Sequence, residues 1–240
     1  MLPQVARVAG RVVLALAVLY GVLVGLGLLL TRVFDKSAFL QNEEELNEAL
    51  ADSRTQTLND LTYVFSGLGN TGAIIGALVV VAIGLRVATK RWAPSLFLMT
   101  AVSAQALVFL LVTLTIDRQR PDVKQLDDSP PTSSFPSGHT GASLALFVGS
   151  ALLVWLYVRR RWVKILLLAV LVAAPVLVAY ARLYRGMHSP SDVIGSLVNA
   201  GGSITIAARN ILWPARGGDP APDPGPAPAP TTPAGATTNT

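Results

Sequence analysis

The two histidines of the chain, His139 and His188, suggest a chemistry before any element of structure is considered. His139 ends the tetrapeptide Pro-Ser-Gly-His, and His188 precedes Asp192 by four residues. One imidazole can attack phosphorus as a nucleophile while the other protonates the leaving oxygen. A carboxylate bonded to the nucleophilic imidazole would fix its tautomer and leave the second nitrogen free. His188, His139 and Asp192 are therefore the candidate catalytic residues.

Four further positions are suited to holding a phosphoryl group. Transfer spreads negative charge over the equatorial oxygens of phosphorus, so the site needs fixed cations and hydrogen-bond donors. Arg120 and Arg182 offer planar, bidentate donors that match phosphate geometry. The backbone at Ser137 and Gly138 would open a helix, where N–H groups favour an anion and glycine permits close approach. Together these residues suit phosphoryl transfer.

Asp192 also has a purely structural interpretation. In the run from Ser189 to Asp192, Ser-Pro-Ser-Asp, a serine can be the N-cap, a proline the first helical residue and the acid the third. This is a favourable start for a helix. Asp192 is thus either the cap of the following helix or the partner of His188, and the sequence leaves both interpretations open.

Six long apolar stretches must position these residues, and they indicate a membrane protein. The 240 residues are 52% hydrophobic and 14% charged, whereas a soluble domain carries about 25% charged residues. A helix needs about 20 apolar residues to cross the hydrocarbon layer. The sequence therefore predicts an all-α bundle of six transmembrane helices, at about 8–30, 67–85, 95–116, 139–157, 165–183 and 191–208. Polar residues dilute the sixth stretch, which is tolerated where helices face one another.

Two segments lie outside these spans. Residues 37–58, between the first and second spans, are acidic with apolar residues at loosely helical spacing. They form either a short helix on the outer membrane surface or a solvated segment. Residues 214–240 consist mainly of Pro, Ala, Gly and Thr, so we expect a disordered tail after a membrane domain of residues 1–213.

The basic residues indicate the orientation of the chain. With a cytoplasmic N-terminus, the inside segments carry more Lys and Arg than the outside ones, as the positive-inside rule requires. Both termini are then cytoplasmic, and the candidate site lies at the extracytoplasmic face of a multi-pass plasma-membrane protein. In the first span, Gly21-x-x-x-Gly25 is either a homodimer interface or simply an instance of the small residues common in spans.

The quoted residues resemble the signature of the type 2 phosphatidic acid phosphatases, also called the lipid phosphate phosphatase superfamily. That signature has three parts: Lys, six residues and Arg-Pro; then Pro-Ser-Gly-His; then Ser-Arg, five residues, His, three residues and Asp. Here Arg120 and its proline match the end of the first part, and the tetrapeptide ending at His139 matches the second in full. Arg182, His188 and Asp192 match the third, so the resemblance covers roughly residues 110–200.

The resemblance implies a role for each matching position. His188 would be the nucleophile that forms a phosphohistidine, Asp192 its orienting partner and His139 the general acid. The implied phosphate ligands are Arg120, Arg182, Ser137 and Gly138. The family uses no metal, so neither a metal nor another cofactor is expected.

Two positions depart from the family pattern. Thr113 stands where the lysine should be, and Ala181 replaces the serine before Arg182. Loss of the lysine removes one phosphate cation. Three basic residues are candidates to compensate, Arg118, Lys124 and Arg185, and Arg118 is the nearest in sequence, which makes it a further phosphate-binding candidate.

The resulting prediction is a metal-independent hydrolase of a lipid phosphate or diphosphate, such as polyprenyl diphosphate, phosphatidic acid or phosphatidylglycerol phosphate. The alternatives are a phosphotransferase of the same fold, a catalytically degenerate lipid-binding protein and a transporter. A transporter usually places ionisable groups near the bilayer midplane, and these spans are nearly free of them. The expected partners are membrane lipids and the lipid phosphate, and nucleic acid is not among them.

Overall fold

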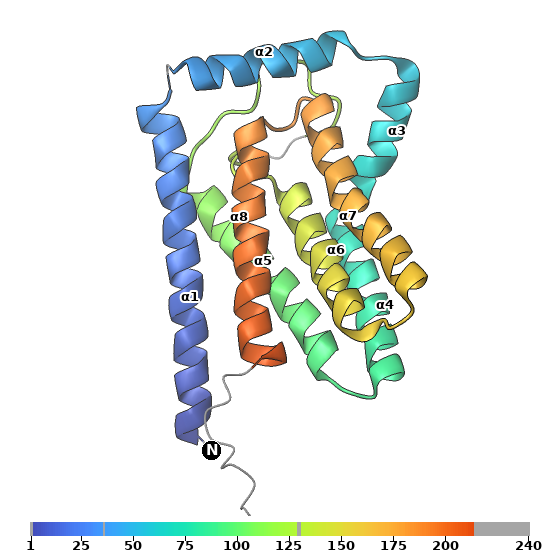
Figure 1. Ribbon diagram of the computed structural model, residues 1–240. Coiled ribbons are helices and arrows are strands. Elements are labelled where there is room, and N and C mark those ends of the chain that lie inside the picture. The colour runs from blue at the N-terminus through green and yellow to red at the C-terminus, as the bar shows by residue number, and fades with distance from the viewer. Residues whose placement is uncertain (1, 36, 129–130, 214–240) are drawn as a thin grey trace, which may run out of the picture.

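The computed structural model describes residues 2–35, 37–128 and 131–213, and every regular element in these ranges is a helix (Figure 1). This confirms the all-α fold. Short π-helical turns, η1 (Leu29–Val33) and η2 (Ala208–Leu212), extend the first and last helices. The tail 214–240, for which the sequence predicts disorder, lies outside the described residues. In chain order the α-helices are α1 (Leu2–Leu28), α2 (Ala38–Asp52), α3 (Gln56–Gly67), α4 (Thr71–Thr89), α5 (Ala93–Thr115), α6 (Gly138–Tyr157), α7 (Arg161–Tyr184) and α8 (Pro190–Ala207).

Five helices are long and apolar enough to cross a membrane, namely α1 with its π-turn, α4, α5, α6 and α7. They coincide with the first five predicted spans, and the boundaries shift where local capping decides them. The second span begins at Thr71 rather than near 67, because the Asn70 side chain accepts a hydrogen bond from the Gly72 N–H and caps α4.

The helix at the sixth predicted span, α8, is more polar than the other five, and it is not among the helices whose length and hydropathy suit a membrane crossing. It nevertheless packs inside the bundle against α1, α5 and α6. Several of its polar side chains are hidden from the surroundings, since Asp192, Ser196 and Asn199 are fully buried, while the apolar Ile194 and Leu197 point outward. Polar side chains are tolerated in a span when neighbouring helices satisfy them.

The centre of the bundle is formed by α5, α6 and α8, which contact one another, with α4 and α7 packed outside them. Phe97, Leu98 and Leu146 belong to the main buried apolar cluster. In contrast, large apolar residues such as Val80 and Leu114 are widely exposed on the outer faces. An apolar exterior of this kind is suited to lipid rather than to water.

The segment between the first two spans contains two helices, where the sequence predicted one short helix or a loop. Figure 1 shows α2 lying across one end of the bundle and α3 turning down toward α4. The break between α2 and α3 is fixed by hydrogen bonds of two residues that lie in it. Arg54 donates to the carbonyl oxygens of Tyr184 and Lys124, and Thr55 begins α3 by accepting from the Leu58 N–H. The α2 end of the bundle is also where the candidate site residues gather.

The start of α1 and the end of α8 lie at the opposite end of the bundle from α2 (Figure 1). This arrangement agrees with the predicted alternation of spans, and the membrane side of each end remains a prediction. Gly21 and Gly25 on α1 have open space around their Cα atoms, with no atom within 4 Å of an added Cβ. Their role in a homodimer also remains a prediction.

Candidate active site

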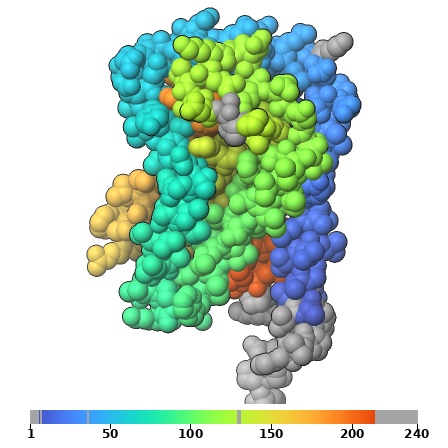
Figure 2. All heavy atoms as spheres, turned by 180° about the vertical axis from the view of Figure 1, so that it is seen from behind, coloured from blue at the N-terminus to red at the C-terminus, as the bar shows by residue number. Residues whose placement is uncertain are grey.

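A cavity of about 910 Å³ opens at the α2 end of the bundle, between the α3–α4 corner and α5. Seen from behind the view of Figure 1, the surface is hollowed between the teal atoms of α3 and α4 and the green atoms of α5 (Figure 2). Of the candidate site residues, those that line this cavity are Arg120, Gly138, His139, Arg182 and His188. The fold therefore brings together residues from the 116–137 loop, α6, α7 and the α7–α8 turn.

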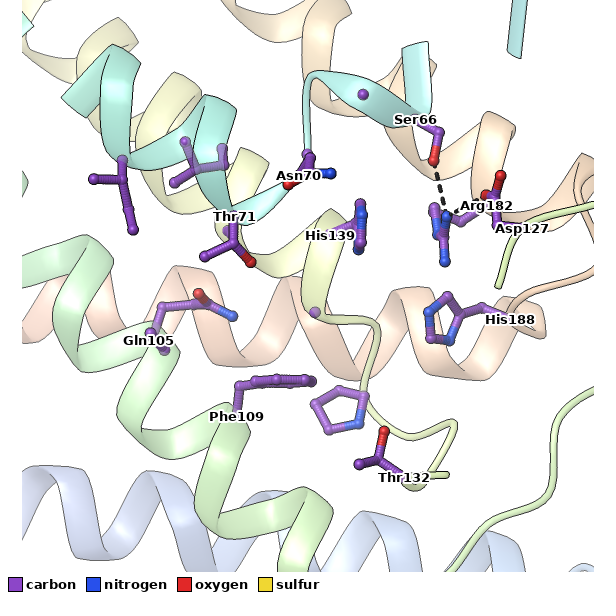
Figure 3. A pocket seen from close by; sticks show the side chains of 18 of the residues that line it. Ser66, Asn70, Thr71, Gln105, Phe109, Asp127, Thr132, His139, Arg182 and His188 are labelled. Atoms are coloured by element: carbon purple, nitrogen blue, oxygen red, sulfur yellow. Dashed lines mark hydrogen bonds and ion pairs between the residues drawn. The ribbon is translucent and has the colours of Figure 1, made fainter. Parts of the chain in front are cut away.

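His188 lies in the turn between α7 and α8, where it is only 4% exposed yet lines the cavity (Figure 3). Its Nδ1 is 2.9 Å from the carbonyl oxygen of Ser134 and 3.5 Å from Oδ2 of Asp192. Because a carbonyl oxygen only accepts, Nδ1 carries the proton and Nε2 keeps a free lone pair. Burial lowers the pKa of His188 below its ordinary value of 6.5, although the hydrogen bond and charge of Asp192 oppose the shift.

Asp192 lies next to both of the groups that the sequence left open, the start of α8 and the His188 ring. Its Oδ2 accepts a hydrogen bond from the Ser189 N–H at 2.9 Å, which caps α8. The same oxygen accepts from Ser134 Oγ and faces His188. Its Oδ1 accepts from Arg118 NH1 at 2.6 Å. The carboxylate is fully buried, so these donors replace water around its charge.

His139 stands one residue into α6, and its ring faces the same space as Arg182 and His188 (Figure 3). The corner between α3 and α4 packs closely on it. A Cβ added at Gly69 would lie 2.9 Å from the His139 carbonyl oxygen, so only glycine fits there without displacement. Figure 3 shows Asn70 on this corner beside His139.

The two halves of the Ser137-Gly138 pair have different positions. Ser137 is the N-cap of α6, with its Oγ donating to Thr140 Oγ1 at 2.9 Å, and it does not line the cavity. Gly138 lines the cavity, and an added Cβ would meet the Phe109 ring at 2.8 Å. The start of α6 therefore faces the cavity through Gly138, whereas the Ser137 hydroxyl is bound to Thr140 within the helix.

Arg182 is held by fixed partners at the cavity wall. Its NH1 donates to Ser66 Oγ at 2.8 Å and to Asp127 Oδ2 at 2.7 Å, while its Nε is buried and has no hydrogen-bond partner in the described parts of the chain. Arg120 NH1 donates to the carbonyl oxygen of Met187 at 2.7 Å. Both arginines are thus oriented by the protein before any phosphate arrives.

Asp127 is shared between Arg182 and Arg185, and its carboxylate accepts from Arg185 NH2 at 2.6 Å. Burial acts to raise the pKa of Asp127, but the hydrogen bond from Arg185 and the charges of both arginines outweigh burial and hold the pKa below 3.8. The carboxylate therefore offsets part of the positive charge at the wall of the cavity.

The three basic residues proposed to replace the family lysine lie outside the cavity lining. Arg118 donates to Asp192 and to Glu43, and Arg185 is bound to Asp127. Lys124 is exposed. Thr113 itself bonds within its own helix, to the Leu110 carbonyl oxygen. Arg118 was predicted to bind phosphate because it is the basic residue nearest in sequence to the missing lysine. In the fold its guanidinium group is hydrogen-bonded to two carboxylates instead.

Sequence reasoning missed several side chains that contact the site residues, among them Ser134, Asp127 and Glu43. Each lies in a segment with no motif or strong periodicity, and each acts through a contact with a residue more than 50 positions away. The Ser-Ser and Asp-Asp pairs of the 116–137 loop were the available signals, and neither indicates a partner. In the described ranges, no three histidine, aspartate or glutamate side chains gather in one place.

A family model, described as the PAP2 superfamily, matches residues 91–215, which is more than half of the chain and includes every candidate site residue. This chain belongs to the PAP2 superfamily. One PAP2 relative is phosphatidylglycerophosphatase B of Bacillus subtilis (strain 168), which is 25% identical over 170 residues, covering 70% of this chain and 82% of that protein.

Two crystal structures are similar in fold to most of the chain. The transmembrane PAP2 type phosphatidylglycerolphosphate phosphatase from Bacillus subtilis has a TM-score of 0.68 at 20% identity, covering 85% of this chain and 97% of that one. Aquifex aeolicus LpxE has a TM-score of 0.53 at 24% identity, covering 68% and 92%. At these identities the likeness establishes the PAP2 fold.

Proposed function

We propose that this PAP2 protein hydrolyses a lipid phosphate or diphosphate through a phosphohistidine on His188, at the extracytoplasmic face of the membrane. One observation carries the proposal. His188, with a free Nε2, opens into the same cavity as His139, Arg120 and Arg182, and the rest of that cavity is largely apolar. A nucleophile, an acid and two fixed cations are the parts that phosphoryl transfer needs.

In the first step, Nε2 of His188 attacks phosphorus and forms an N–P bond as the bond to the lipid oxygen breaks. His139 donates its proton to that leaving oxygen, so the lipid departs as a neutral alcohol, or as a lipid monophosphate when the substrate is a diphosphate. The imidazole of His188 gains positive charge, which the neighbouring Asp192 carboxylate stabilises. Arg120 and Arg182 hold the equatorial oxygens throughout.

In the second step, water attacks the phosphohistidine from the side that the lipid has left. His139 is now neutral and accepts the proton of this water. The N–P bond breaks, inorganic phosphate leaves, and both imidazoles return to their starting states. The Ser134 carbonyl keeps the Nδ1 proton on His188 through the cycle, so the same nitrogen is regenerated as nucleophile.

The walls of the cavity support an amphiphilic substrate. Away from the histidines it is lined by apolar side chains of α4 and α5, including Ile74, Leu78, Val102 and Leu110. A phosphate head at the arginines would leave its apolar portion between these two helices, in contact with lipid. Among the candidate substrates, phosphatidylglycerol phosphate gains support from the names of the Bacillus subtilis relatives.

The proposal is tested by measuring inorganic phosphate released from a panel of lipid phosphates by wild type and by His188→Ala. We expect turnover of at least one lipid by wild type and none by the variant, with both proteins folded in detergent. Substrate labelled with ³²P at the transferred phosphorus should label wild type transiently, with an acid-labile adduct, and should not label the variant. Unchanged turnover in His188→Ala would refute the nucleophile, and transfer to an organic acceptor without free phosphate would indicate a phosphotransferase.

A further inference from the structure

Helix α2 lies across one end of the bundle and directs two buried polar side chains toward the start of α8, directly after His188. Glu43 is 5% exposed and Asn47 is 1% exposed, whereas Glu45 and Glu48 on the same helix are exposed. A buried carboxylate is costly unless donors surround it. The partners of Glu43 therefore show what this helix holds in place.

Glu43 binds the first turn of α8 and a basic side chain from the 116–137 loop. Its Oε1 accepts from the Ser191 N–H at 2.6 Å, and its Oε2 accepts from Ser191 Oγ at 2.8 Å and from Arg118 NH2 at 3.1 Å. One turn further along α2, Asn47 Nδ2 donates to Ser189 Oγ at 3.4 Å. Helix α2 is thus hydrogen-bonded to residues that follow His188 directly in the chain.

Arg118 connects Glu43 to the catalytic carboxylate. Its NH1 donates to Asp192 Oδ1 at 2.6 Å and its NH2 to Glu43, so one guanidinium group is shared by two buried carboxylates. The other oxygen of Asp192 lies 3.5 Å from His188 Nδ1. Glu43, Arg118, Asp192 and His188 therefore form an unbroken chain of contacts from the surface helix to the nucleophile.

We propose that Glu43 is a positioning residue of the reaction: it shares Arg118 with Asp192, so that Asp192 keeps the place and the negative charge that support His188 during attack. The proposal rests on the phosphohistidine mechanism above. With both carboxylates present, the three side chains carry a net charge of −1. Without the Glu43 charge, Arg118 neutralises Asp192 alone, and the positive charge that develops on His188 loses electrostatic support.

Glu43 lies outside the cavity lining, so its loss should act on turnover and leave substrate binding nearly unchanged. In metal enzymes, removing a residue that holds a ligand in place lowers activity by about 10- to 100-fold. Glu43 acts on Asp192 in a comparable way, and we expect an effect at the lower end of that range. Glu43→Gln should lower kcat by about tenfold with little change in KM. The matched control is Glu45→Gln, which removes the same charge from an exposed position of the same helix and should behave as wild type.

A double-mutant cycle with Arg118 separates positioning from a general loss of structure. If Glu43 acts through Arg118, Glu43→Gln should have no further effect on kcat in a protein that already carries Arg118→Gln. If the Arg118→Gln protein does not fold, Arg118→Lys takes its place as the background. Equal effects of Glu43→Gln in both backgrounds, or equal kcat for Glu43→Gln and Glu45→Gln, would overturn the proposal.

Orthovanadate provides a readout that does not depend on turnover, because vanadate can bond to an imidazole as a phosphoryl-transfer analogue. We expect Glu43→Gln to weaken vanadate binding, measured by calorimetry, and Glu45→Gln to leave it unchanged. If wild type released no phosphate from any lipid, the proposed hydrolase would fail while this measurement still tested the contact chain. Equal vanadate affinity in wild type and Glu43→Gln would refute the chain itself.

Discussion

Replacing Arg182 by lysine should separate the contribution of charge from that of donor geometry in the phosphate site. Arg182 is 5% exposed, and its guanidinium group is already bound through NH1 to Ser66 and Asp127. Its Nε is buried and has no hydrogen-bond partner in the described ranges, and we expect it to donate to a phosphate oxygen when substrate binds. A lysine keeps the positive charge but has no group at the position of Nε.

The expected loss follows from that single donor. A hydrogen bond to a charged group contributes about 1.5–3 kcal/mol, and each 1.36 kcal/mol corresponds to about a factor of ten in rate. Arg182→Lys should therefore lower kcat/KM by roughly 10- to 150-fold. The fold should survive, because Asp127 keeps the hydrogen bonds that it receives from Arg185.

The assay is release of inorganic phosphate from a short-chain lipid phosphate in mixed micelles, with the melting temperature of each protein measured in the same detergent. Arg159→Lys is the matched control, since Arg159 is exposed at the far end of the bundle and should tolerate the change. An Arg182→Lys enzyme that is folded and within threefold of wild type in kcat/KM would show that the buried Nε is not a phosphate donor.

Three further predictions concern pH, stability and packing. Because burial lowers the pKa of His188, its neutral, nucleophilic form should persist on acidification, and the acid limb of the kcat/KM profile should lie below pH 6.5; a limb at or above 6.5 would contradict this. Asp127 has a lowered pKa in the fold, so its ion pairs should stabilise the protein above pH 3.8 and be lost as pH falls through the folded-state value. The melting temperature of Asp127→Asn should accordingly lie below wild type at pH 7, and the difference should shrink below pH 3.8; a constant difference would argue against the ion pairs. Gly69→Ala should lower both melting temperature and kcat, at a cost of about 1–3 kcal/mol, because the added Cβ meets His139. Gly84→Ala is the control: Gly84 has open space and lies outside the cavity lining, so this variant should lower neither.

The sequence alone was enough to locate five of the six predicted spans and several of the residues that line the cavity. A run of about 20 apolar residues has few alternatives to a membrane helix, so α1, α4, α5, α6 and α7 lie where hydropathy predicted them. The residue types His139, Arg120, Arg182 and His188 were also recognisable, and the fold brings all four to one cavity.

Contacts between distant segments required the tertiary structure. The guanidinium of Arg118 was predicted to bind phosphate, yet it lies between Asp192 and Glu43, and Glu43 comes from a helix 75 positions away in the chain. The sequence also could not separate the cap of α8 from the partner of His188; in the fold Asp192 caps α8 and also lies 3.5 Å from the His188 ring.

What the sequence determined, then, is the set of helices and the chemical identity of the groups at their ends, because hydrophobicity and residue type are local properties. What only the tertiary structure decided is which carboxylate faces which cation. No motif marks Ser134, Asp127 or Glu43, and their partners are set by how α2 and the 116–137 loop pack over the bundle. The direction and burial of a charge depend on neighbours that no single stretch of sequence contains.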